Sequence, residues 1–306
     1  MPTSLDQKPD TYQTPSKRLP PLRSLLPVGL AVVTLLCICI IAGSGQPVSP
    51  PRAVSPPLPE HTLSPSGALP SPTLPEPTLP AEPLYDFSQP APESPAVDGD
   101  YFSDAVFLGD SRTDGLRLYS GIRPEDVFFH NGLMIFEAAD PECKLIKGPD
   151  GALRSILDLL GEKQYAKVYT MFGINELGYG DDQAFYDTYL QFLDEIHRLQ
   201  PDAILYVQAI IPVNEDIAKV HDGRQYVTNA KIADYNALLK QFCAEKQVIY
   251  LDLATALTDE DGVLPAEGTT DGVHFRKEWY QKWYEYLKTH TVSTGDYSWV
   301  QDGRVS

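Results

Sequence analysis

The sequence predicts a three-layer α/β domain, in which a parallel β-sheet carries helices on both faces. Apolar runs of strand length, rich in Val, Ile, Tyr and Phe, alternate with stretches of helical spacing, which is the pattern of consecutive βα units. The chain has 306 residues. Roughly two hundred of these, from residue 97 onward, are enough for one compact domain.

Five strands are expected, and each is a short apolar run that ends at a Gly or a polar residue. They lie at 105–108, 127–129, 167–172, 203–209 and 248–253. Apolar residues with a period near 3.6 predict helices between and after the strands. These helices are expected at 113–119, 152–160, 183–199, 229–245 and 276–288.

Two parts of this pattern carry expectations about packing and surface. In the last helix, Trp279, Trp283 and Leu287 are spaced four residues apart, so the stripe should pack on the sheet. The polar segment 213–227 follows the fourth strand. It is long enough to be either a substrate-binding loop or an ordinary surface loop.

A membrane anchor is predicted near the N-terminus. Residues 25–42 are 18 uncharged, mostly apolar residues, which is the short end of the range for a membrane-spanning helix. Lys17, Arg18 and Arg23 precede the run, and positive charge there favours a cytoplasmic N-terminus with the rest of the chain exported. A cleaved signal peptide is the alternative, because small residues follow the run. Both interpretations export the domain.

The segment between the anchor and the domain is predicted to be an extended linker. Sixteen of the 28 prolines lie between residues 47 and 95, where the only Lys or Arg is Arg52. Such a segment cannot bury a core and favours polyproline II. The predicted organisation is a cytoplasmic tail at 1–24, the anchor at 25–43, the linker at 44–97, the catalytic domain at 98–290 and a tail at 291–306.

Charge and cysteine content narrow the possible functions. The net charge is −18 and the pI about 4.6, which argues against nucleic acid as a partner because phosphate binding needs clustered Lys and Arg. None of the four cysteines has metal-ligand spacing with a His, and no cofactor or metal is expected. In an exported domain Cys143 and Cys243 could pair, or they could be two separate thiols.

Residues typical of active sites follow the ends of the predicted strands. In an open parallel sheet these ends share the edge at which ligands bind, so the residues are expected to lie together. The four sites are Gly109-Asp110-Ser111, Asn131-Gly132, the stretch Gly173-Ile174-Asn175-Glu176, and Asp271-Gly272-Val273-His274 before the last helix.

Ser111 has two interpretations. With Asp114 three residues later it resembles a capping box at a helix start, and it could be only that. It could instead be a nucleophile for acyl transfer. Both roles are compatible, because a turn that exposes a capping hydroxyl can also expose a nucleophile. Arg112, the next residue, could meet an anionic substrate or pair with Asp114.

Acyl transfer accounts for all four sites. Ser111 would be the nucleophile, His274 the base that takes its proton, and Asp271 the carboxylate that orients the imidazole. The tetrahedral intermediate needs hydrogen-bond donors for its oxyanion. The backbone N–H groups of Ser111 and Gly132 and the side-chain amide of Asn175 are the candidates.

The four blocks resemble those of the SGNH, or GDSL, hydrolases, a family named for Ser, Gly, Asn and His. The resemblance covers residues 105–287 in the family's order. It implies a flavodoxin-like α/β/α fold, with Ser111 as nucleophile and an Asp three residues before the His. The chain departs from the family at Glu176, where Asp more often follows the Asn. The stretch HNGLMIF around Gly132 is only loosely like the second block.

These observations predict a membrane-anchored serine esterase outside the cell. A domain joined by a long linker to a bacterial membrane would suit a substrate fixed in the envelope, such as an acylated carbohydrate. The predicted reaction removes a small acyl group, most plausibly acetyl, from that carbohydrate. An O-acetyltransferase that acylates a glycan through the same site is one alternative. A carbohydrate-binding domain with a silent triad is another.

Overall fold

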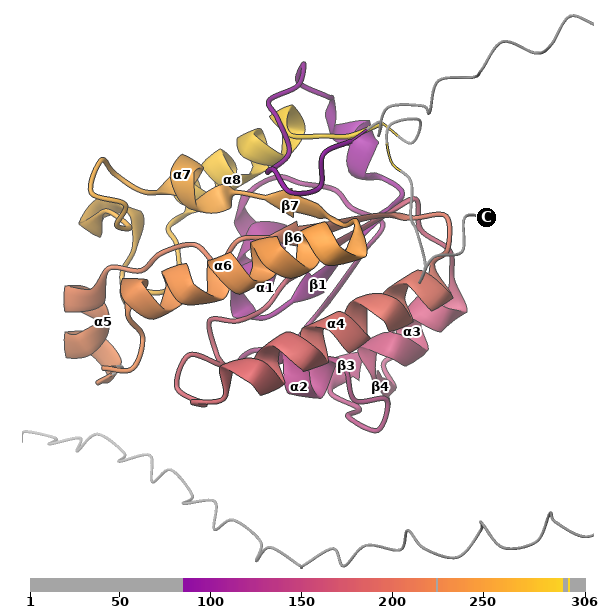
Figure 1. Ribbon diagram of the computed structural model, residues 1–306, viewed down its shortest axis with the longest axis horizontal. Coiled ribbons are helices and arrows are strands. Elements are labelled where there is room, and N and C mark those ends of the chain that lie inside the picture. The colour runs from indigo at the N-terminus through magenta and orange to yellow at the C-terminus, as the bar shows by residue number, and fades with distance from the viewer. Residues whose placement is uncertain (1–84, 224, 294–296, 298–306) are drawn as a thin grey trace, which may run out of the picture. The chain divides into compact units, whose positions relative to one another are not determined.

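The structure is a computed structural model, which describes residues 85–223, 225–293 and 297 (Figure 1). The predicted cytoplasmic tail, the anchor and most of the linker lie outside these residues. Within the described part of the chain, no helix is long and apolar enough to cross a membrane.

A five-stranded parallel sheet forms the centre of the domain, as predicted. Its strand order is β2-β1-β5-β6-β7. Helices cover both of its faces (Figure 1), which gives the expected three-layer α/β fold. The strands are β1 (Ala105–Gly109), β2 (Asp126–Phe129), β5 (Lys167–Met171), β6 (Ile204–Gln208) and β7 (Ile249–Leu251).

Three of the predicted long helices agree with the structure to within one residue at each end, and the other helices are short. The α-helices are α1 (Ser111–Tyr119), α2 (Ile135–Ala138), α3 (Ile156–Glu162), α4 (Asp182–Leu199), α5 (Glu215–Asp222), α6 (Asn229–Lys246), α7 (Leu253–Leu257) and α8 (Lys277–Thr289). Two 3₁₀ turns, Gly99–Phe102 and Ala266–Gly268, complete the elements of the described chain.

The two faces of the sheet bury separate hydrophobic clusters, because successive side chains of a strand point to opposite sides. Val106 and Leu108 of β1 join one cluster with residues of α3, α4 and α6. Phe107 joins the other with residues of α1, α7 and α8. Trp283 and Leu287 of α8 are fully buried in this second cluster, so the predicted stripe of α8 is core.

The third helix begins later than predicted. Residues 152–160 were expected to be helical, but α3 starts at Ile156 because Ser155 caps it. The Ser155 hydroxyl accepts a hydrogen bond from the Asp158 N–H at 3.0 Å, and the Asp158 carboxylate accepts one from the Ser155 N–H, which is a capping box. Lys144 also contacts Asp158, at 2.5 Å.

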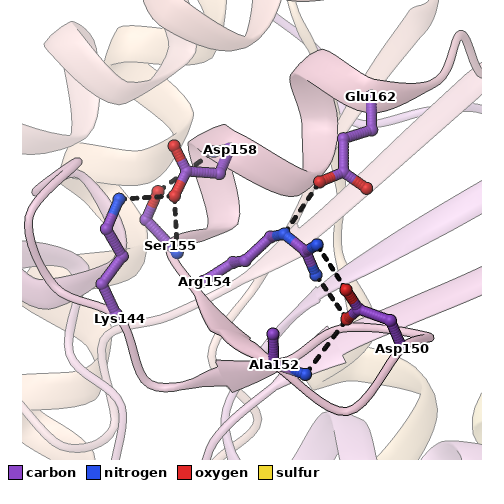
Figure 2. Close-up of polar contacts among 7 residues, drawn as sticks. All are labelled: Lys144, Asp150, Ala152, Arg154, Ser155, Asp158 and Glu162. Carbon is purple, nitrogen blue, oxygen red and sulfur yellow. Dashed lines mark hydrogen bonds and ion pairs between the residues drawn. The ribbon is translucent and has the colours of Figure 1, made fainter.

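A short antiparallel hairpin precedes α3 and was not predicted. It pairs β3 (Ile146–Lys147) with β4 (Leu153–Arg154). Figure 2 shows the contacts of Arg154, the last residue of β4. Its guanidinium donates to both carboxylate oxygens of Asp150 at 2.7 Å and contacts Glu162 at 2.9 Å. These ion pairs tie the hairpin to its own turn and to α3.

The folded domain begins earlier than the predicted boundary at residue 98. Pro90 forms a parallel bridge with Tyr250 of β7, and the Ala91 N–H donates to the Tyr250 carbonyl at 2.8 Å. Phe87 and Ala91 are buried in the core of this face. The end of the proline-rich segment therefore covers the open edge of β7, a position where proline is tolerated because one side needs no N–H donor.

The predicted C-terminal tail also begins too early. Val292 is buried, and its N–H donates to the Tyr206 hydroxyl at 3.1 Å. The Tyr297 ring lies against Phe87, with 6.0 Å between ring centroids.

Elsewhere in the domain, Cys143 and Cys243 are free thiols, and burial raises the pKa of Cys243 well above its ordinary value.

Candidate active site

The predicted site residues gather around one pocket at the carboxyl edge of the sheet. The pocket has a volume of about 400 Å³. Ser111, Gly132, Asn175 and His274 all line it, and Asp271 contacts His274 from behind. The full lining is Ser111, Asn131, Gly132, Ile174, Asn175, Tyr226, Val227, Val273 and His274.

Ser111, His274 and Asp271 form a continuous hydrogen-bonded chain. The Ser111 Oγ lies 2.7 Å from His274 Nε2, and His274 Nδ1 lies 2.6 Å from Asp271 Oδ2. A carboxylate accepts hydrogen bonds, so the arrangement assigns the imidazole proton to Nδ1 and leaves Nε2 as the acceptor for the serine hydroxyl. This is the tautomer in which an imidazole can remove a proton from a serine.

The Asp271 carboxylate is held ionised by its surroundings. Burial is the largest single effect and would raise its pKa, but the hydrogen bonds from the His274 ring and from two backbone N–H groups together outweigh it. Its other oxygen accepts from the N–H groups of Val273 at 2.9 Å and His274 at 2.7 Å. The result is a pKa below the usual range. The side chain is 14% exposed, so it is partly shielded from water.

A helix that the sequence did not predict supports the loop that carries Asp271 and His274. The segment 213–227 was expected to be a loop, but α5 occupies most of it. Asn214 caps α5, and its N–H donates to the Gly272 carbonyl at 2.9 Å. Gly272 has φ +83°, and a Cβ there would come within 2.4 Å of the Ala218 nitrogen. The close approach requires glycine at position 272.

Only the end of segment 213–227 reaches the pocket, through Tyr226 and Val227. The signals for α5 were present in the sequence. Asn214 is a favoured N-cap, acidic residues fill the first turn, and Gly223 ends the helix in the left-handed conformation, with φ +63°.

The residue that caps α1 is Asp110 and not Ser111, so the capping-box interpretation of Ser111 is wrong. The Asp110 carboxylate accepts a hydrogen bond from the Arg112 N–H at 2.8 Å, and Ser111 is the first residue of the helix. Asp114, the supposed partner of Ser111, pairs with Arg117 instead, at 2.6 Å. Ser111 is thus free of the cap and faces the pocket.

Arg112 is completely buried and does not line the pocket, which argues against contact with a substrate. Its Nε donates to the Val273 carbonyl at 3.1 Å, and its Nη1 donates to the Ile211 carbonyl at 2.8 Å. The guanidinium also lies over the Phe275 ring, 4.9 Å from its centroid. Arg112 therefore connects the start of α1, next to the nucleophile, to the loop of His274.

The three candidate oxyanion donors differ in their surroundings. Ser111 begins α1, where backbone N–H groups lack helical partners. Gly132 has φ +78°, and a Cβ there would meet nothing within 4 Å, so glycine is favoured there by backbone conformation and not by lack of space. The Asn175 amide donates to Asp110 Oδ2 and to the Leu133 carbonyl, both at 3.1 Å, so an oxyanion would compete for one of these hydrogens.

Glu176 is a buried carboxyl group directly behind the pocket. It has no exposed surface, and its Oε1 accepts a hydrogen bond from the Ile135 N–H at 2.5 Å. Burial raises the pKa of Glu176 to about 8 despite that bond, and the neighbouring Asp110 carboxyl adds to the rise. Burial also raises the pKa of Asp110, which Arg112 opposes. The sequence marked Glu176 only as a departure from the usual Asp.

The described residues contain no group of three or more His, Cys, Asp or Glu side chains placed to hold a metal ion.

Comparison with known proteins identifies similar chains. Residues 144–282 match the model of the GDSL-like Lipase/Acylhydrolase family. The matched stretch includes Asn175, Asp271 and His274 and begins after Ser111 and Gly132. No curated protein matches the chain.

Solved structures that match part of this chain include three from different organisms. A GDSL-like lipase from Bacteroides thetaiotaomicron is 15% identical over 62% of this chain and 87% of its own, with a TM-score of 0.45. A carbohydrate esterase family 3 protein from Talaromyces cellulolyticus is 16% identical over 60% and 94%, with a TM-score of 0.42. The periplasmic domain of a lipopolysaccharide acetyltransferase from Salmonella ser. Paratyphi A is 16% identical over 60% and 82%, with a TM-score of 0.42.

Proposed function

We propose that the chain carries a domain of the GDSL-like lipase/acylhydrolase family, and that this domain is a serine esterase that removes a small acyl group, most simply acetyl, from a carbohydrate of the cell envelope. The observation that carries the proposal is the hydrogen-bonded chain from Ser111 Oγ through the His274 ring to Asp271. A helix cap alone would not need a base and a carboxylate in this order.

The proposed reaction begins when Ser111 Oγ attacks the ester carbonyl and His274 Nε2 takes the hydroxyl proton. Asp271 stays ionised, because its pKa is low, and stabilises the imidazolium. The oxyanion faces the N–H groups of Ser111 and Gly132 and the Asn175 amide. The carbon–oxygen bond to the sugar then breaks, and His274 gives the proton to the departing alcohol. Water, activated by His274, releases the acyl group and regenerates the serine.

The lining of the pocket supports a small acyl group and a neutral, polar leaving group. Ile174, Val227 and Val273 supply apolar walls, while Asn131 and Asn175 supply amide groups. No Lys or Arg of the described residues lines the pocket. A compact acyl chain fits a site of about 400 Å³ that also has to admit part of the alcohol.

Exposed aromatic side chains beside the pocket support a sugar as the leaving group. Tyr226 lines the pocket and is 53% exposed. Its ring packs over Gly178, where an added Cβ would lie 2.9 Å from the ring. The next residue, Tyr179, is 60% exposed, and its ring lies 4.6 Å from that of Phe136. Amphipathic rings of this kind offer a flat apolar face with a hydroxyl at its edge.

Turnover of p-nitrophenyl acetate is the direct test of the nucleophile. The protein used should include residues 73–306, because a start at residue 98 would remove Phe87 and Ala91 from the core. We expect Ser111→Ala to lower kcat at least about 10³-fold, while Ser103→Ala, a change at an exposed serine, leaves it unchanged. Equal activity of the two variants would rule out Ser111 as the nucleophile.

An acetylated oligosaccharide tests the sugar and the acceptor. Tyr226→Ala should lower kcat/KM for the sugar ester about 3–10-fold more than for p-nitrophenyl acetate, because only the sugar contacts the ring. Tyr119→Ala is the matched control, since Tyr119 is a 49% exposed ring on α1 that packs on Tyr280. If added glycan takes the acyl group in place of water, the enzyme is a transferase. Glycan binding without any Ser111-dependent turnover would indicate a binding domain.

We also propose that the domain works outside the cell, held at the membrane by residues 25–42. The uncharged run and the positive residues before it support this orientation. The full-length chain should stay in washed membranes and be cut by protease added to intact cells. A shortened chain in the medium would instead indicate a cleaved signal peptide.

A further inference from the structure

Glu176 contacts the loop that carries one of the candidate oxyanion donors. Its Oε1 accepts from the N–H of Ile135, the first residue of α2, at 2.5 Å. Gly132 lies three residues before Ile135, in the loop that follows β2. Since α2 has only four residues, its own hydrogen bonds do little to fix this loop.

Asn175, the residue before Glu176, makes a second hydrogen bond to the same loop, and in this bond the loop is the acceptor and not the donor. The Asn175 amide donates to the Leu133 carbonyl at 3.1 Å, while Glu176 accepts from the Ile135 N–H. Two adjacent residues in the turn after β5 thus bind two backbone groups of the loop. These groups are a carbonyl and an N–H that lie two residues apart. Two such bonds restrict both the position and the rotation of the backbone just after Gly132.

We propose that Glu176 is a positioning residue, whose carboxyl group holds the loop 131–135 so that the Gly132 N–H points at the reacting oxygen. The proposal rests on the proposed esterase function. It gives a physical reason for Glu in place of the more usual Asp, because an Asp side chain is shorter by one methylene, about 1.5 Å, and would not reach the Ile135 N–H from the same backbone.

The protonation state of Glu176 is consistent with this role. Within the described residues Oε2 is buried without a hydrogen-bond partner, and Asp110 is a second buried carboxyl nearby. Two adjacent buried carboxylates repel each other, so a neutral Glu176 is the stable form near pH 7. A neutral side chain with an oxygen acceptor is sufficient to hold Ile135, and a Gln can therefore replace it.

Three substitutions separate positioning from simple stabilisation. Glu176→Gln keeps an oxygen acceptor of the same length, Glu176→Asp shortens the side chain, and Glu176→Leu removes the acceptor. With p-nitrophenyl acetate, we expect Gln to stay within about 3-fold of the unmodified kcat. Asp and Leu should lower kcat about 10–100-fold, with KM changed less than about 3-fold, because oxyanion donors act mainly in the transition state.

Gln200→Leu is the matched control. Gln200 is also fully buried and bonds backbone groups, accepting from the Tyr165 N–H at 2.8 Å and donating to the Leu160 carbonyl at 2.5 Å. It lies near the amino ends of β5 and β6, opposite the pocket. Its loss should lower the unfolding midpoint but leave kcat unchanged at temperatures where the protein is folded.

The results can separate this proposal from the proposed function. The positioning role is wrong if the unmodified protein shows Ser111-dependent turnover and Glu176→Asp has the same kcat, or if Gln200→Leu lowers kcat as much as Glu176→Leu. If Glu176→Leu does not fold, Glu176→Asp with Glu176→Gln as its rescue decides the question. If no ester gives Ser111-dependent turnover in the unmodified protein, the proposed function fails and the positioning role fails with it.

Discussion

The polar contacts of the β3–β4 hairpin and those behind the active-site pocket use the same kinds of groups in opposite environments. In the hairpin, the Arg154 side chain is 26% exposed and its partners Asp150 and Glu162 are about half exposed (Figure 2). Behind the pocket, Arg112, Asp110 and Glu176 have no exposed surface. The comparison shows how exposure to water changes the contribution of a polar contact to stability.

Exposed ion pairs contribute little to the free energy of unfolding, because water solvates the separated charges almost as well and salt screens their attraction. Buried polar groups differ in that each one has lost its water and depends on its protein partners. Breaking one such contact leaves a group that nothing else can solvate. The hairpin should therefore tolerate substitution, whereas the groups behind the pocket should not.

The largest effect is expected at the triad carboxylate, and it should appear in rate and not in stability. Asp271→Asn keeps the shape but no longer fixes the proton on His274 Nδ1, so kcat should fall about 10³–10⁴-fold. The unfolding midpoint should move little, because Asp271 is only partly buried. Steady-state kinetics and urea unfolding of the same preparation measure both. A large loss of stability with normal kcat would assign Asp271 to the structural contacts.

The next effect tests the buried side of the comparison. Arg112→Met removes the hydrogen bonds to the carbonyl groups of Val273 and Ile211 and the cation beside Asp110. We expect a loss of about 2–4 kcal/mol in the free energy of unfolding, measured in urea at pH 7. A change no larger than that of Arg154→Met would show that burial does not distinguish the two arginines.

An effect that depends on pH is expected at Glu176. Its pKa is about 8 in the folded protein against 4.5 for the free side chain, so the folded state keeps a proton that the unfolded state releases. The stability from this group is complete below pH 4.5 and is lost as the pH rises to about 8, at up to about 1.4 kcal/mol per pH unit.

Glu176→Gln removes that titration. The free energy of unfolding of the variant, relative to the unmodified protein, should therefore rise between pH 5 and pH 8. Urea unfolding at several pH values measures the difference. Parallel curves for the two proteins would show that the carboxyl of Glu176 is not protonated in the folded state at neutral pH.

The smallest effect is expected in the hairpin. Arg154→Met removes the contacts to Asp150 and Glu162, and the change in the unfolding midpoint should be slight. In 1 M NaCl the two proteins should unfold at the same urea concentration, because exposed charges are then screened. A large, salt-independent loss would mean that the network of Figure 2 is as essential as the contacts behind the pocket.

Long elements with a clear period could be predicted from the sequence, and short ones could not. The periodic run 229–245 matches α6, Asn229–Lys246, because one face of this helix is buried over its whole length. The strands β3 and β4 have two residues each, too few to show an alternating pattern. The helix α5 was missed although its caps are visible, because its apolar residues are few.

The candidate site divides in the same way. Ser111, Gly132, Asn175 and His274 could be found because each follows a strand or precedes a helix, and the carboxyl ends of parallel strands must share one edge. The cap of α1 was assigned to the wrong residue, since Asp110 and Ser111 are both good N-caps. Local sequence does not decide which of two adjacent side chains turns back to the helix.

The sequence by itself determined the order of the strands and helices along the chain, the residues that stand at the strand ends, and the type of chemistry they can perform. All of these depend on local spacing and residue type. Tertiary structure alone decided that Arg112 is buried, that Glu176 is buried near Asp110, which raises its pKa, and that α5 supports the loop of His274. Desolvation and the partners that offset it come from segments far apart in the chain, and no local pattern records them.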